Sequence, residues 1–178
     1  FIGFANFESD HGNVAPTQRL SRGAATGLTQ PRASVVTRTG RLLISRGNGG
    51  ILGWNRATEA VGTTQPDVEV DGSNTGLDSA IPFAYDPEKD RLLVGNTQAG
   101  MGILVFDDVS SSGFDGNISP DRTFGPDDRV PHSSGGTIKM TIDAFKLNDG
   151  KLYTVDTSGA AVNSSRILVF NSSSNANG

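Results

Sequence analysis

The stretch "GILVFDDVSSSGFDGNISPDRTF" (Gly102–Phe124) decides the fold of this 178-residue sequence, because its parts recur elsewhere in the chain. Its apolar segment, Ile103–Phe106, returns as Ile167–Phe170, and looser copies stand at Phe1–Phe4 and Ile51–Trp54. Self-similarity at a spacing of about 50 residues is the mark of a repeat architecture. The sequence therefore predicts repeats that start near residues 1, 51, 103 and 167.

A glycine and, four residues later, a proline follow the apolar segment in three of the four copies. These pairs are Gly12 and Pro16, Gly62 and Pro66, and Gly116 and Pro120. A short strand comes next in the copies at 67–70 and 121–124. Glycine and proline punctuate loops, so each pair predicts a loop between two strands.

Two more strands precede the apolar segment in each repeat. The second of them opens on a basic residue, at Arg41, Arg91 and Lys151, and a turn rich in Asp, Asn, Pro or Gly stands before it. We predict strands at 33–37, 41–45, 51–55, 67–70, 82–86, 91–95, 103–107, 121–124, about 140–146, 151–155 and 166–170, with almost no helix.

The second and third strands of each repeat are apolar at consecutive positions, as in Leu42–Ile44 and Ile103–Phe106. A strand with this pattern has both faces of its sheet covered. Four-stranded antiparallel sheets that are sandwiched between neighbours are the blades of a β-propeller. The sequence thus predicts an all-β propeller, and a parallel β-helix is the second interpretation.

The segments "YDPEKDRLLVGNTQAGMGILVFDD" (85–108) and "GNISPDRTF" (116–124) resemble a blade of the NHL/YVTN-type propeller repeats, which are common in bacterial secreted and periplasmic proteins. The resemblance covers nearly the whole chain. It implies a fold and an extracellular or periplasmic location, while the function stays open because such propellers serve as binding modules, scaffolds, lactonases and lyases. The first repeat departs from the pattern at Gly3, and the third carries an insertion at 127–140.

The ends of the sequence fall inside the repeat. Residues 1–170 read as a single propeller domain or part of one, followed by a polar tail at 171–178. About three repeats are present, whereas propellers close with roughly four to eight blades. We therefore expect a protein partner to cover Phe1–Phe4 and Ile167–Phe170, in the form of missing blades of the same chain or neighbouring copies.

Composition excludes several classes of partner and site. The formal net charge is −4, and the 15 Lys and Arg residues are scattered, so nucleic acid is not expected as a partner. No apolar run reaches the length of a membrane span. The chain has no cysteine, which excludes disulfides and thiolate metal sites.

The two histidines, His11 and His132, fall in loops that a propeller places on opposite faces, so they are not expected to share a site. Candidate metal ligands are Asp71, Asp78, Asp115 and His132. Calcium takes such oxygen ligands, but Asp and Asn are also ordinary turn formers, and turn formation is the favoured interpretation. No catalytic residue and no cofactor is assigned.

Four aromatic side chains recur at the end of the apolar segment: Phe4, Trp54, Phe106 and Phe170. Their period predicts that they pack between sheets. The Gly-rich segment "SRGNGGILG" (45–53) links two strands and is interpreted as a flexible turn.

The leading functional hypothesis is a non-enzymatic extracytoplasmic propeller that is a binding module or a structural subunit. The alternative is a lactonase- or lyase-like propeller enzyme with a metal in its central channel.

Overall fold

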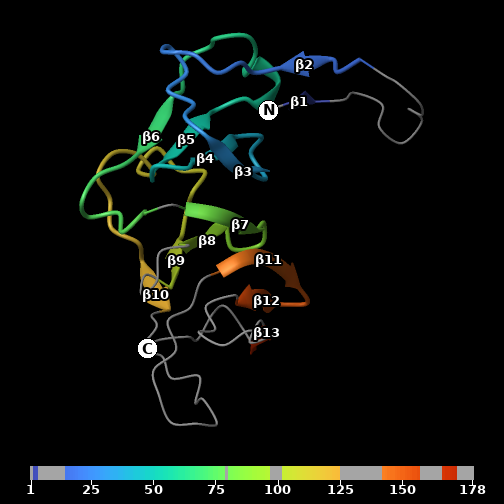
Figure 1. Ribbon diagram of the computed structural model, residues 1–178, viewed down its shortest axis with the longest axis vertical. Helices are drawn as coiled ribbons and strands as arrows, with labels where there is room; N and C mark the ends of the chain where they lie inside the picture. The colour runs from blue at the N-terminus through green and yellow to red at the C-terminus, as the bar shows by residue number, and fades with distance from the viewer. Residues whose placement is uncertain are drawn as a thin grey trace.

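The computed structural model describes residues 2–3, 15–78, 80–96, 102–124, 142–156 and 166–171. Within these residues the chain is all-β, and its one helical segment is a single 3-10 turn, η1 (Ala57–Glu59). The strands form an N-terminal pair and three larger antiparallel sheets of four, four and three strands. Figure 1 shows the three sheets one after another along the long axis of the molecule.

The strands of the three larger sheets occur where the sequence predicts them. The N-terminal pair is β1 (Ile2–Gly3) and β2 (Gln18–Arg19). The first sheet is β3 (Pro31–Val36), β4 (Leu42–Arg46), β5 (Ile51–Trp54) and β6 (Val68–Val70). The second is β7 (Ala80–Asp86), β8 (Arg91–Asn96), β9 (Ile103–Phe106) and β10 (Arg122–Phe124), and the third is β11 (Ile142–Asn148), β12 (Lys151–Asp156) and β13 (Arg166–Asn171). Every strand end in the three sheets lies within two residues of its predicted position.

Strands that follow one another in the sequence are neighbours in each sheet. The turn from the first strand to the second uses a residue with positive φ directly before the basic residue of the repeat: Gly40 (86°), Asp90 (50°) and Gly150 (70°). Tight hairpin turns need this backbone conformation, which glycine and aspartate tolerate better than most residues. The recurring turn chemistry therefore sets where each second strand begins.

The predicted two-sided burial is confirmed. Every residue of β4, β5, β8 and β9 is buried. Because side chains alternate along a strand, Leu42 and Trp54 pack with Leu20 near the N-terminal pair, whereas Leu43 and Ile51 pack toward the second sheet. Two apolar layers thus sandwich each of these central strands.

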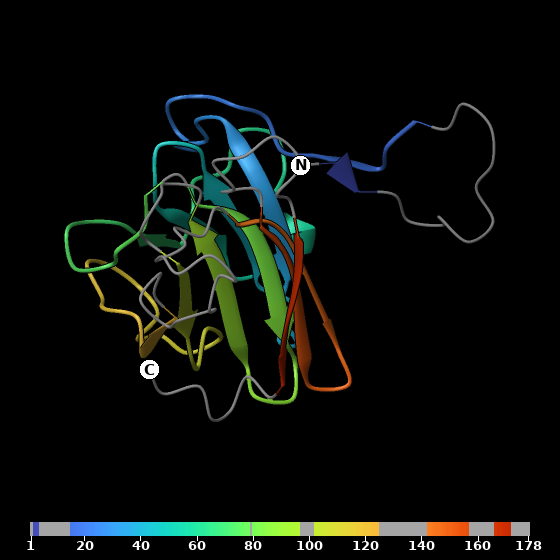
Figure 2. The ribbon, with the colours of Figure 1, turned by 60° about the horizontal axis from the view of Figure 1, so that its bottom comes forward.

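The sheets lie side by side through their first strands. β3 lies beside β7, and β7 lies beside β11. Figure 2 shows these three strands running along the same side of the molecule. Each sheet therefore meets the next in the same way, and the loops at their ends complete the junctions.

Candidate functional site

The recurring glycine joins one sheet to the sheet before it. Gly62 donates its N–H to Arg19 O and accepts from Ser21 N, at 2.8 and 2.7 Å. Gly116 repeats the contact with Glu69 O and Asp71 N, at 2.9 and 3.2 Å, so that each glycine forms a parallel bridge to a preceding fourth strand or its end. The φ angles are 58° and 76°, and no heavy atom would lie within 4 Å of an added Cβ. Backbone conformation, rather than space, is thus the reason for glycine here.

An aspartate after the recurring proline caps the loop between the third and fourth strands. The carboxylate of Asp67 accepts from Asn55 N at 2.8 Å, and that of Asp121 accepts from Asp107 N at 2.7 Å. The same aspartates donate their own N–H groups to Gly53 O and Val105 O. This pair of bonds holds the fourth strand in register with the third.

The basic residue that opens each second strand faces the residue that follows the third strand. Arg41 donates through Nε to Asn55 Oδ1 at 3.0 Å, and its Nη1 donates to Val109 O and Ser111 O in the loop between β9 and β10. Arg91 binds Asp107, which also accepts from Arg122 at 2.8 Å. In the third sheet, Lys151 stands opposite Asn171. Arg41 therefore ties two sheets together, because its guanidinium spans the junction.

Asp90 lies at the centre of a polar cluster between the first and second sheets. Its carboxylate accepts from Tyr85 Oη at 2.8 Å, Ser110 Oγ at 2.7 Å and Ser110 N at 3.0 Å. Tyr85 Oη accepts in turn from Arg38 N. Burial acts to raise the pKa of Asp90, but the hydrogen bonds from Ser110 and Tyr85 outweigh it and hold that pKa below its usual value. Burial raises the pKa of the Tyr85 phenol.

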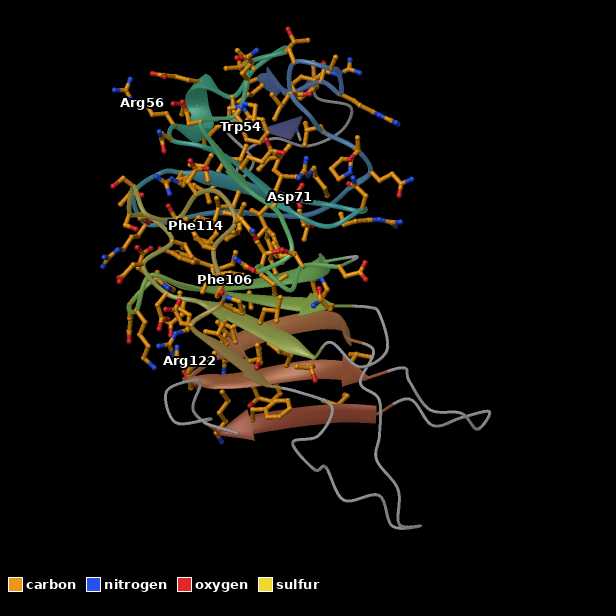
Figure 3. The ribbon with its side chains drawn as sticks, turned by 90° about the vertical axis from the view of Figure 1, so that its left-hand side faces the viewer. Trp54, Arg56, Asp71, Phe106, Phe114 and Arg122 are labelled. Carbon is orange, nitrogen blue, oxygen red and sulfur yellow. The ribbon has the colours of Figure 1, made fainter. Side chains whose placement is uncertain are left out.

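Aromatic side chains fill the same junctions, as predicted. Trp54 and Phe106 are 2% and 1% exposed, and the Trp54 indole donates to Thr64 O at 3.0 Å. Phe106 meets Phe114 edge to face, with ring centroids 5.8 Å apart (Figure 3). Phe170 is half-buried against the layer between the second and third sheets. The side chain of Phe4 lies outside the described residues.

The glycine-rich segment is a turn, as predicted, and other groups approach its glycines closely. A Cβ on Gly50 would lie 2.4 Å from Arg46 Nη2, and one on Gly47 would lie 2.9 Å from Gln30. These glycines allow other groups to pack closely. The buried Arg46 guanidinium passes Gly50 to reach Glu69 and Asp71, at 2.8 and 2.6 Å. The sequence signal for this ion pair is the alternation of Glu69 and Asp71 at a fourth strand, with an arginine at the end of the second strand of the same sheet.

The predicted metal ligands do not converge within the described residues. Asp71 pairs with Arg46 and accepts from Gly72 N, and Asp115 accepts from Glu69 N at 2.9 Å. Asp78 donates its backbone N–H to Asn96 Oδ1. His11 and His132 lie outside the described residues. In the part of the chain that the structure describes, no three His, Asp or Glu side chains are grouped so that they could hold a metal ion.

A shallow depression of about 380 Å³ lies at the end of β5. Its lining residues are Trp54, Asn55, Arg56, Glu59, Thr64 and Asp67. Their polar groups are largely engaged with one another: Arg56 pairs with Glu59 at 2.6 Å, and Asp67 caps Asn55 N. Figure 3 shows Arg56 extending away from the sheets into solvent. The depression is therefore built from the local loop contacts.

The outer face of the third sheet differs from the others. Ile167 and Val169 are 70% and 48% exposed, whereas Ile103 and Val105 at the same repeat positions are 0% exposed. Among the described residues, no strand pairs with the outer edge of β13. An apolar face and an open strand edge thus lie together on one side of the molecule, and they are the candidate functional site.

Comparisons with known proteins identify no family for this chain. No family model matches the chain, and no curated protein matches it. One similar solved structure is the crystal structure of the computationally designed Ika4 protein, with 15% sequence identity and a TM-score of 0.45. The match covers 80% of this chain and 66% of that chain. Among the described residues, no helix is long and apolar enough to cross a membrane.

Proposed function

We propose that residues 1–170 form part of an extracytoplasmic β-propeller, with each sheet as one blade, and that the chain is a non-enzymatic binding or assembly module. Two features support the propeller. Successive sheets meet through their first strands, and glycine, aspartate and basic residues recur at equivalent places in the loops. Such a regular, nearest-neighbour arrangement is what a blade-by-blade architecture requires.

The exposed face of β13 is the single observation that carries the binding function. Ile51 and Ile103 occupy the same repeat position as Ile167, and both are fully buried by the following sheet. Ile167 presents the same apolar side chain at 70% exposure. An apolar surface that is buried in every equivalent sheet fits a protein partner that covers it in the same manner.

The described ionisable groups at the junctions also fit a structural role. Asp107 pairs with Arg91 and Arg122, Asp90 accepts from Tyr85 and Ser110, and the Arg46 guanidinium is shared by Glu69 and Asp71. Each of these groups therefore stabilises a loop or a sheet junction.

The proposal is tested by the association of the 178-residue chain in sedimentation velocity over a wide concentration range. We expect species larger than 18.6 kDa, and we expect the Ile167→Lys/Val169→Lys variant to associate roughly tenfold more weakly because two charges would have to be buried. Val61→Lys is the matched control, since Val61 is an exposed valine at 45% in the first sheet's loop. A stable 18.6 kDa monomer with the β13 amides protected from hydrogen exchange would contradict the proposal.

A further inference from the structure

The first and second sheets show what a fourth strand needs in order to pair with a third strand. In both sheets the fourth strand follows a Pro–Asp pair, at Pro66–Asp67 and Pro120–Asp121. Ile51 stands opposite Val70, and Ile103 stands opposite Phe124, so the residue three places after the aspartate lies opposite the isoleucine. The rule is the same in two sheets whose fourth strands, VEV and RTF, share no residue.

The aspartate has the same partners in both sheets. Its carboxylate accepts from the residue that follows the third strand's aromatic residue, at Asn55 N and Asp107 N. Its own N–H donates to a carbonyl of the third strand, at Gly53 and Val105, two residues before Asn55 and Asp107. Because hydrogen bonds to a charged acceptor are stronger than neutral ones, the aspartate is the most specific feature of the incoming strand.

β13 carries the same acceptor positions. By the register of the repeat, Asn171 corresponds to Asn55 and Asp107, Val169 corresponds to Gly53 and Val105, and Ile167 corresponds to Ile51 and Ile103. Ile167 and Val169 are exposed, and no described strand pairs with this edge.

We propose that the outer edge of β13 is an acceptor for one strand of a partner polypeptide, a strand that begins with Pro–Asp and carries an apolar residue three places after the aspartate. The strand pairs antiparallel to β13, with its apolar residue opposite Ile167. Its aspartate carboxylate accepts from Asn171 N, and its aspartate N–H donates to Val169 O. The inference rests on the proposed binding function, and it specifies the chemistry of the partner.

The probe is a peptide that copies Ile118–Phe124, "ISPDRTF", added to the full 178-residue chain. We expect saturable binding at peptide concentrations up to about 1 mM, with slower hydrogen exchange at the amides of β13 that face the open edge. A peptide in which Asp121 is replaced by Ala should bind roughly tenfold more weakly, since it lacks the charged acceptor. A peptide of the same composition in scrambled order is the control.

A second measurement distinguishes a strand that a partner polypeptide supplies from a strand that the same chain supplies. It uses an extended variant of the chain, in which a copy of residues 108–124 follows Asn171 in place of residues 172–178. The control is the same extended variant with Gly and Ser in place of the copied residues 120–124. If neither the peptide nor this extension slows exchange in β13 relative to its control, the acceptor is disproved. If only the extension does so, the partner-polypeptide source is wrong and the strand belongs to a continuous chain.

The two proposals fail separately. The extension assay measures strand pairing within one dilute chain, whereas the proposed function is measured by the association that depends on the face of Ile167 and Val169. Association that survives without any strand pairing would leave the binding function and overturn the acceptor. Strand pairing without association would support the acceptor and overturn the binding function.

Discussion

The third strands of the second and third sheets share the segment ILVF but have very different surroundings. β8 and β9 are buried at every residue between two apolar layers, while β13 exposes Ile167 and Val169 on its outer face. The second sheet also has a fourth strand, β10, which is held by Asp121 and Arg122. The burial of these third strands therefore depends on what neighbouring sheets and loops supply, because their shared ILVF residues are the same.

The largest expected effect concerns the aromatic residue at the end of the third strand. Phe106→Ala should lower the free energy of unfolding by about 3–5 kcal/mol, because it leaves a cavity beside Phe114 in a fully buried layer. Phe170→Ala, at the same repeat position, should cost less, since Phe170 is only half-buried. Urea denaturation of both variants measures the difference. Equal losses would mean that the third sheet is covered as completely as the second.

The next effect concerns the basic residue that opens the second strand. Arg91→Met should cost about 2–3 kcal/mol, because it leaves Asp107 with only Arg122 while the Arg91 position is 7% exposed. Lys151→Met is the matched variant in the third sheet, where the side chain is exposed, and should change stability by less than about 0.5 kcal/mol. Thermal unfolding of the pair measures both values. A large loss for Lys151→Met would show that the third sheet has an ion pair of similar strength.

The smallest effect is a pH dependence at the junction of the first and second sheets. The pKa of Asp90 in the folded protein lies below the value of 3.8 for an unperturbed aspartate, so its stabilising contribution is fully present above pH 3.8. That contribution is lost as the pH falls through the lower folded pKa. Asp90→Asn should therefore reduce stability at neutral pH and make it less steeply dependent on pH below 3.8. Denaturation curves at several acidic pH values would reveal an unchanged slope if Asp90 had no such role.

The position of the candidate site could be predicted from the sequence, but the long-range contacts between the sheets could not. The repeat placed Ile167–Phe170 on a third strand, and β13 contains these residues and pairs with β12. The contacts of the recurring glycine were not predicted, because Gly62 and Gly116 bond to the sheet before their own. Such a contact joins residues that are 41 or more positions apart in sequence, and no local pattern encodes the partner.

Local patterns in the sequence specify the strands, their order and their turns, because alternation, β-propensity and turn chemistry act over a few neighbouring residues. The burial of three identical side chains depends instead on long-range packing. Ile51, Ile103 and Ile167 stand in equivalent segments, yet the first two are fully buried and the third is 70% exposed. Burial depends on what packs against a residue from distant parts of the chain, and an isoleucine carries no information about the neighbour that covers it.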